Sequence, residues 1–177
     1  MDATMEKVRK AGTSVQTKSS ETGRIELRVR RLTGEDLLSA ASAERILKVI
    51  TQLIENEEVL DFTVLSDPDT WVMGIFEGVV VEGEFEDPFL IGMATANFKH
   101  SWTGWKIIVD DVIVFDKNRH KGIGRALMEA MEELGALHEP PCKTVVLTSD
   151  RNDAFAFYYR IGYTTRGEQQ FKKRLKG

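Results

Sequence analysis

The sequence predicts a single α/β domain, built on a mixed and twisted β-sheet of about seven strands with about four flanking helices. Two kinds of segment occur in turn along the chain. In one kind apolar and polar residues alternate, which is typical of half-buried strands. In the other kind apolar residues recur every three or four positions, which is typical of amphipathic helices. The length of 177 residues suits one domain, and 42% hydrophobic and 29% charged residues are ordinary for a globular protein.

The domain is expected to begin near Arg24. Residues 1–23 are rich in Ser, Thr and Lys and show little apolar periodicity, so we expect a flexible tail there and a folded domain over 24–177. Alternation of apolar and charged residues from Ile25 predicts the first strand. Thr33 with Asp36 three positions later resembles a capping box, which predicts a short helix after that strand.

The remaining elements follow from periodicity and from turn residues. They are a helix from about Ser42, a strand at Trp71–Phe76, an acidic loop at Glu82–Pro88, strands at Phe89–Lys99 and Ile107–Phe115, a helix from Gly122 to about His138, a central buried strand at Thr144–Thr148, a helix at Asn152–Ile161, and a final hairpin of Tyr163–Gly167 with Gln170–Leu175. The order is therefore β-α-α-β-β-β-α-β-α-β-β.

Charge and composition argue against several classes of protein. The formal net charge of −4 disfavours binding to nucleic acid or to an anionic membrane surface. The longest apolar runs are too short to span a bilayer, and the first residues lack the apolar core of a signal peptide. A single cysteine allows neither an intramolecular disulfide nor a thiolate metal cage. We therefore expect a cytoplasmic protein with no metal site.

The segment Arg119–Arg125 carries the clearest chemical signal. It joins a strand to a helix and contains two glycines, Gly122 and Gly124, which allow backbone N–H groups to close around a ligand. The unpaired N–H groups and the positive dipole end of the helix favour an anion such as phosphate, and basic side chains stand beside them. A dinucleotide fingerprint would need a third glycine where Leu127 stands, and no Walker-type Gly-Lys-Ser/Thr run exists. A glycine turn before a solvated basic helix remains an alternative.

Two motifs resemble signatures of the GNAT superfamily of N-acetyltransferases. The pattern Arg119-x-x-Gly122-x-Gly124 is similar to the superfamily's coenzyme A loop, and Asp110–Val114 looks like its fourth strand. Asn152–Tyr163 is similar to its second signature, although Arg151 occupies the position where the usual asparagine is expected. The resemblance covers about residues 24–175 and is greatest to glucosamine 6-phosphate N-acetyltransferase-like members.

The resemblance implies a sheet that splays between its fourth and fifth strands and a loop that binds acetyl-CoA. The pantetheine arm would lie along the fourth strand, and the diphosphate would lie in the glycine loop. The residues that the resemblance assigns to coenzyme A are Val112, Ile113, Val114, Arg119, His120, Lys121, Gly122, Ile123, Gly124, Arg125, Asn152 and Tyr158.

Catalysis by amine attack needs a base, and the resemblance implies an acid for the departing thiolate. Asp110 or Asp111 would accept the amine proton, directly or through water. Successive strand residues point to opposite faces, so only one of the two faces the substrate, and we favour Asp110 because a bulge can invert the alternation. Tyr158 matches the superfamily's acid, and Tyr159 is the adjacent alternative. Solvated carboxylates and a packed aromatic helix face are the structural alternatives.

The substrate is less clear from the sequence. The resemblance implies a homodimer that acetylates a primary amine, with glucosamine 6-phosphate as the suggested substrate. Asp110, Asp150, Lys172 and Lys173 would then contact the sugar phosphate. Polyamines, aminoglycosides, protein N-termini and lysines are competing substrates, and the acidic run Glu82–Asp87 could attract a cationic amine or be merely solvated. A non-catalytic sensor that binds acyl-CoA is the alternative from a different functional class.

Overall fold

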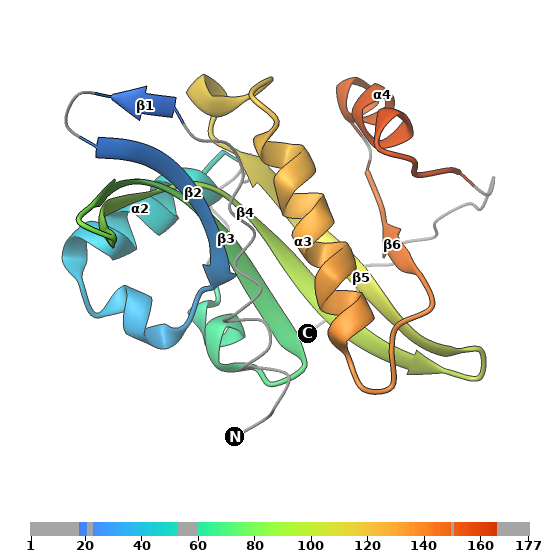
Figure 1. Ribbon diagram of the computed structural model, residues 1–177. Coiled ribbons are helices and arrows are strands. Elements are labelled where there is room, and N and C mark those ends of the chain that lie inside the picture. The colour runs from blue at the N-terminus through green and yellow to red at the C-terminus, as the bar shows by residue number, and fades with distance from the viewer. Residues whose placement is uncertain (1–17, 21–22, 53–59, 150, 166–177) are drawn as a thin grey trace. The chain divides into compact units, whose positions relative to one another are not determined.

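The computed structural model describes residues 18–20, 23–52, 60–149 and 151–165 (Figure 1). The chain divides after Leu147 into two compact units, Met1–Leu147 and Thr148–Gly177. The first unit contains the sheet, and the second contains the helix α4 (Asn152–Arg160). None of the helices in these described ranges has the length and apolarity that crossing a membrane requires.

Within the described ranges, six strands form one mixed sheet in the order of the chain. They are β1 (Lys18–Ser20), β2 (Gly23–Arg31), β3 (Thr70–Val81), β4 (Glu84–Ser101), β5 (Gly104–Val114) and β6 (Val145–Leu147). Neighbours are antiparallel except β5 and β6, which run parallel because a helix connects them. The predicted mixed α/β fold is therefore confirmed. The sheet begins before Arg24, since β1 lies in the segment that we expected to be a tail.

Two α-helices of the first unit cover opposite faces of the sheet (Figure 1). They are α2 (Ala40–Ile50) and α3 (Ile123–Leu137). Met93 packs in a cluster with Ile46 and Val49 of α2, whereas a Cβ at the adjacent Gly92 would meet Leu127 of α3. Consecutive strand residues point to opposite faces, so the helices lie on different sides. We call these sides the α2 face and the α3 face.

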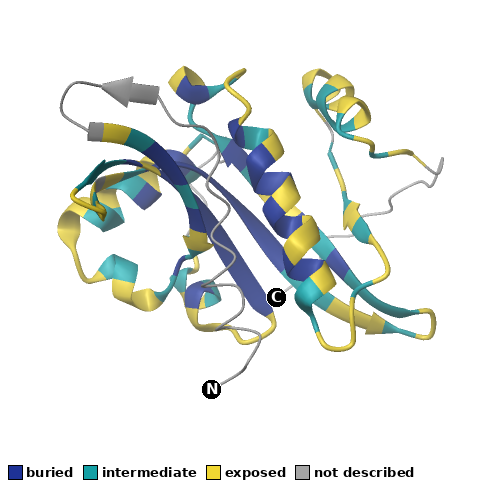
Figure 2. Ribbon diagram, viewed as in Figure 1, coloured by how far each residue is buried: buried dark blue, intermediate teal, exposed yellow. Residues whose placement is uncertain are grey.

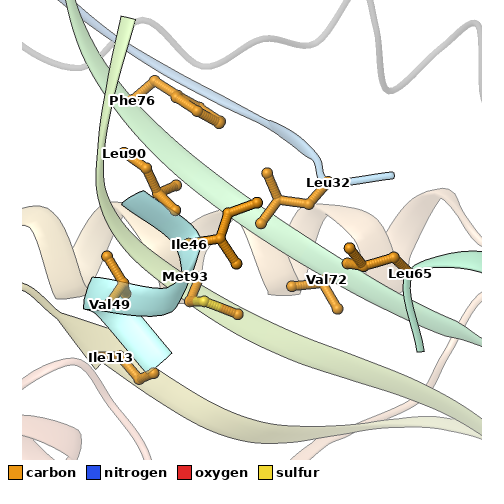
Figure 3. Close-up of a cluster of buried hydrophobic side chains, with 9 residues drawn as sticks. All are labelled: Leu32, Ile46, Val49, Leu65, Val72, Phe76, Leu90, Met93 and Ile113. Carbon is orange, nitrogen blue, oxygen red and sulfur yellow. The ribbon is translucent and has the colours of Figure 1, made fainter. Parts of the chain in front are cut away.

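The core on the α2 face is a cluster of nine buried apolar side chains (Figure 3). They are Leu32, Ile46, Val49, Leu65, Val72, Phe76, Leu90, Met93 and Ile113. On the other face, the apolar stripe of α3 is buried, as its periodicity predicts: Leu127 and Met131 are fully shielded and Leu134 nearly so. Figure 2 shows buried positions concentrated on the central strands and on one side of α3. This packing fixes the start of α3 against β4 and β5.

The prediction of an acidic loop at Glu82–Pro88 is wrong, because β4 already begins at Glu84. Glu82 and Gly83 both have positive φ, 50° and 91°, which is the conformation of a two-residue turn that matches the twist of a hairpin. Val81 pairs with Glu84, and the guanidinium of Arg28 lies 4.4 Å from the ring centroid of Phe85. Cross-strand contacts therefore hold these charged residues in a strand.

The short helix expected after Thr33 is a 3₁₀ turn, η1 (Gly34–Leu37), and the backbone N–H of Thr33 donates to Asp36 Oδ2 at 2.8 Å. A second 3₁₀ turn, η2 (Phe62–Ser66), precedes β3. The strand predicted as central and buried is β6, which is only half-buried and lies at the edge of the described sheet. Of the predicted final hairpin, Tyr163–Thr165 form no strand, and the rest lies outside the described residues.

Candidate active site

The sheet opens beyond the middle of β5. Strand β6 pairs with β5 only over Ile107–Val109, whereas β5 continues to Val114. Over its last five residues β5 therefore has no strand beside it on the β6 side, among the residues that the structure describes. This is the predicted splay between the fourth and fifth strands of the domain, counted from β2.

A β-bulge in β5 lies at the opening. Between the pairs Thr95–Asp110 and Met93–Ile113, β4 advances by two residues and β5 by three. The extra residue is accommodated where Asp111 has a left-handed φ of 52°. The bulge inverts the alternation of side chains. Ile107 approaches Gly135 on the α3 face, while Ile113 packs into the cluster on the α2 face. The two residues are six positions apart, so regular alternation would have placed them on the same face.

The backbone of β5 after the bulge faces away from β4 at every second residue. The N–H of Phe115 donates to the carbonyl of Ile91 at 2.8 Å, so Phe115 is turned toward β4. Alternation then turns the N–H and C=O groups of Val112 and Val114 toward the open side. The carbonyl of Val114 accepts a hydrogen bond from Nε of Arg119 at 3.3 Å. An extended ligand could pair with the remaining groups as an added strand does.

The loop between β5 and α3 presents a row of unpaired N–H groups. It starts with the 3₁₀ turn η3 (Asp116–Asn118), and His120 and Gly122 follow with left-handed φ angles of 61° and 82°. The first N–H of the helix to find a backbone acceptor is that of Ala126, which donates to Gly122 at 3.0 Å. The N–H groups from His120 through Arg125 have no acceptor in the described part of the chain. Unpaired amides at a helix N-terminus favour an anion.

The basic side chains of this loop are not all equally available. Arg119 forms an ion pair with Asp116 at 2.9 Å in addition to its contact with Val114, and Arg125 lies 3.4 Å from Glu129. His120 and Lys121 are exposed. Arg119 therefore ties the loop to the end of β5, while Lys121 is left to add positive charge beside the free N–H groups.

Asp110 and Asp111 occupy different environments. Asp110 shares the α2 face with Thr95, its cross-strand partner, and Oδ2 of Asp110 accepts a hydrogen bond from Nδ2 of Asn97 at 3.0 Å. Burial raises the pKa of the Asp110 carboxyl, and the nearby charge of Asp111 raises it further, while the Asn97 hydrogen bond opposes both. Asp111 sits in the bulge itself. Asn97 was not among the predicted site residues, although a polar residue on a largely apolar strand is a visible signal.

The second unit holds the tyrosines of the second signature. Tyr158 on α4 is half-buried, with its ring centroid 5.0 Å from that of Phe157 and 6.0 Å from that of Tyr163. Burial raises the pKa of the Tyr158 phenol, opposed by the charge of Arg151. Tyr159 is 53% exposed, and its hydroxyl lies 3.2 Å from Thr165 Oγ1. The two phenols are therefore clearly distinguished by their surroundings.

Other predicted site residues are placed only in part. Asn152 is the first residue of α4 and is exposed, and Arg151 before it forms an ion pair with Asp153 at 2.6 Å. Asp150, Lys172 and Lys173 lie outside the described residues. No three His, Cys, Asp or Glu side chains gather into a possible metal site within the described ranges.

Comparisons with known proteins agree with this geometry. The family model for the acetyltransferase (GNAT) domain matches residues 74–165, just over half of the chain. That range runs from β3 to the end of the α4 signature and so contains the opening, the loop and Tyr158. No curated protein matches the chain by sequence.

Solved structures share the fold. An acetyltransferase from Trypanosoma brucei has a TM-score of 0.61 at 21% identity, over 84% of this chain and 99% of that chain. Glucosamine-6-phosphate N-acetyltransferase from Arabidopsis thaliana has a TM-score of 0.63 at 17% identity, over 83% and 97%. AAC(6')-Iy, solved with the bisubstrate analogue CoA-S-monomethyl-acetylneamine, has a TM-score of 0.63 at 15% identity, over 85% and 99%. With the family match over β3 to α4, the chain belongs to the GNAT family of acetyltransferases.

Proposed function

We propose that the protein transfers an acetyl group from acetyl-CoA to a primary amine, which attacks the thioester directly. The observation that carries the proposal is the free row of N–H groups from His120 through Arg125 beside the open edge of β5. The row suits a diphosphate, and the edge at Val112 and Val114 suits an extended pantetheine arm. Coenzyme A carries both of these parts in one molecule, so it fits this arrangement.

Acyl transfer to an amine develops negative charge on the thioester oxygen. A backbone N–H at Val112 is the proposed donor to that oxygen, because it faces the open side of β5. The amine nitrogen forms the new bond to the carbonyl carbon, and the bond from that carbon to sulfur breaks. The chain must therefore remove a proton from the amine and supply one to the sulfur.

Asp110 is the proposed base and Tyr158 the proposed acid. The Asp110 side chain lies on the α2 face beside Thr95. Its raised pKa makes the ionised carboxylate a stronger proton acceptor. Asp111 remains the alternative base. The Tyr158 phenol is protonated at neutral pH, as an ordinary phenol is, and burial raises its pKa further. A thiol of pKa about 8.5 is easily protonated, so the phenol assists without being indispensable.

For the substrate, we propose an amine that carries an anionic group, with glucosamine 6-phosphate as the first candidate. Lys99 and Lys106 stand directly opposite each other on β4 and β5, on the same face as Asp110. Neither forms an ion pair within the described part of the chain. Like charges at opposed positions destabilise a sheet, and a bound phosphate would relieve the repulsion. Lys106 and Asp110 are four residues apart on β5, so their Cα atoms are separated by about 13 Å. The long lysine side chain can bring its ammonium group closer to Asp110 than that.

The resemblance supports further proposals that stand beside this one. A homodimer and contacts from Asp150, Lys172 and Lys173 to a sugar phosphate are carried over from glucosamine 6-phosphate N-acetyltransferase-like proteins. A cytoplasmic location and a domain over 24–177 are proposed from the single cysteine and from the composition of residues 1–23, although the sheet itself begins at β1. Other amines, including polyamines, aminoglycosides, protein N-termini and lysines, are the competing substrates, and a non-catalytic acyl-CoA sensor is the competing function.

A thiol-release assay with acetyl-CoA and a panel of amines tests the proposal. The panel contains glucosamine 6-phosphate, glucosamine, spermidine, an aminoglycoside and a lysine peptide. We expect a higher kcat/KM for glucosamine 6-phosphate than for glucosamine, and we expect this preference to disappear in Lys99→Ala/Lys106→Ala. Turnover of spermidine alone would refute the anionic substrate. No thiol release with any amine, despite acetyl-CoA binding in calorimetry, would refute the enzyme and favour the sensor.

A further inference from the structure

A hydrogen-bonded chain crosses three neighbouring strands on the α2 face and ends at Asp110. Oγ1 of Thr70 on β3 lies 2.8 Å from Oδ1 of Asn97 on β4, and Nδ2 of Asn97 lies 3.0 Å from Oδ2 of Asp110 on β5. Thr70 and Asn97 are directly opposed in the ladder, and Asp110 is the diagonal neighbour of Asn97 on the same face. We infer that Asn97 and Thr70 are positioning residues that orient the Asp110 carboxylate for proton transfer. The inference rests on the proposed function, in which Asp110 is the base.

The hydrogen-bonding capacity of each group determines which group donates and which accepts along this series of hydrogen bonds. An ionised carboxylate only accepts, so Asn97 must turn its NH₂ group to Asp110 and its oxygen to Thr70. The Thr70 hydroxyl then donates to that oxygen. Asp67 Oδ2 also lies near the hydroxyl, but at 3.3 Å, so the shorter contact to Asn97 is the better one. Thr70 is only 8% exposed, and water therefore competes little for its single proton. The carboxylate therefore sets the direction of the Asn97 amide, and the hydrogen bond from Thr70 stabilises the amide in that orientation.

The chain of bonds holds one oxygen of Asp110 and leaves the other available. Oδ1 of Asp110 accepts no hydrogen bond from the described residues, whereas Oδ2 is bound to Asn97. A carboxylate fixed through one oxygen keeps the other in a constant direction, which is what a base needs toward an incoming amine.

The same contact favours the ionised form of the carboxylate. Burial and the charge of Asp111 both favour the protonated form of Asp110, and the donated hydrogen bond from Asn97 favours the ionised form. Removal of this donor should therefore raise the pKa of Asp110 further. A base is active when it is deprotonated, so the acidic limb of the pH profile should move to higher pH.

The first test measures Asp110 without any amine. Carboxyl ¹³C NMR follows the titration of Asp110 in the full-length wild type and in Asn97→Leu, which removes the donor while keeping a side chain of similar size. We expect the midpoint to move to higher pH in Asn97→Leu. The same direction with a smaller change is expected in Thr70→Val, and Thr70→Ser should restore the wild-type midpoint. Thr103→Val removes a hydroxyl from the β4–β5 turn, outside the chain of bonds, and is the control without a shift.

The second test uses the best amine of the panel and measures kcat/KM against pH. On the acidic side, Asn97→Leu should lose about tenfold in kcat/KM, the effect of one charge-assisted hydrogen bond, and should approach the wild type at high pH. Acetyl-CoA affinity should be unchanged in calorimetry. An unshifted titration in both Asn97→Leu and Thr70→Val would overturn the inference. Should Asn97→Leu fail to fold, the comparison of Thr70→Val with Thr70→Ser decides by the same readouts.

Asp110→Asn separates this inference from the proposed function. Loss of the acidic limb in Asp110→Asn, together with an unshifted limb in Asn97→Leu, would overturn the positioning role alone. Full activity with an unchanged pH profile in Asp110→Asn would overturn Asp110 as the base, and the positioning role with it.

Discussion

Replacement of Gly122 by alanine should weaken acetyl-CoA binding, and a matched glycine elsewhere supplies the control. Gly122 precedes α3 with a φ of 82°, and Gly83 in the β3–β4 turn has a φ of 91°. A Cβ added at either position would meet no atom within 4 Å. The two substitutions therefore introduce the same kind of backbone strain without a steric clash. Only Gly122 belongs to the proposed diphosphate loop.

The magnitudes follow from backbone and hydrogen-bond energetics. An L-residue in the left-handed region costs about 1 kcal/mol, so Gly122→Ala and Gly83→Ala should lower the free energy of unfolding by similar amounts. In a chain of this size the melting temperature should fall by roughly 2–4 °C. Relief of the strain at Gly122 would change the φ of this residue and with it the directions of the neighbouring N–H groups. Loss of one charge-assisted hydrogen bond corresponds to at least about a tenfold weaker Kd for acetyl-CoA.

Thermal denaturation and isothermal titration calorimetry with acetyl-CoA measure the two quantities. We expect equal losses of stability, a weakened Kd in Gly122→Ala, and a wild-type Kd in Gly83→Ala. A wild-type Kd in Gly122→Ala would refute the diphosphate loop. Equal weakening in both variants would show that the effect comes from lost stability and would refute the reasoning from local geometry.

Two further predictions concern the phenol and the sheet. Tyr158→Phe should slow thiol release by about a hundredfold, the low end for general acid catalysis, whereas the exposed Tyr159→Phe should retain wild-type turnover; the reverse pattern would identify Tyr159 as the acid. Gly92→Ala should lower the free energy of unfolding by about 1–3 kcal/mol, because its Cβ would lie 2.8 Å from the carbonyl oxygen of Ile113 and 3.2 Å from Leu127. Urea denaturation checks this, with Gly34→Ala as control, since the nearest atom there is 3.8 Å away; equal losses would contradict the argument.

Elements governed by local periodicity were predictable from the chain alone. The helix expected from Gly122 to about His138 is α3 over Ile123–Leu137, and the strand expected at Ile107–Phe115 lies almost wholly within β5. An apolar repeat of three or four residues specifies one helix face whatever lies opposite. The strand-loop-helix segment around Gly122 was recognisable for the same reason.

Elements that depend on cross-strand pairing were not predictable in this way. The acidic residues from Glu84 read as a loop by composition, yet they form part of β4 because they pair with β3 across a two-residue turn. Similarly, Val145–Leu147 is apolar enough for a buried strand, but its burial depends on which segment lies beyond it. Such features are decided by residues distant in sequence, which no local pattern records.

The proposed catalytic residues depend partly on the sequence and partly on the tertiary structure. From the chain alone came the family motifs, the loop Arg119–Gly124 and the choice between two adjacent carboxylates. Which faces the residues after Asp110 occupy depended on a one-residue bulge opposite β4, and the contact of Asp110 with Asn97 depended on register. Side-chain direction in a sheet has a period of two, so a single extra residue reverses it. Residue types therefore identified the chemistry, while the pairing of three strands decided how the groups meet.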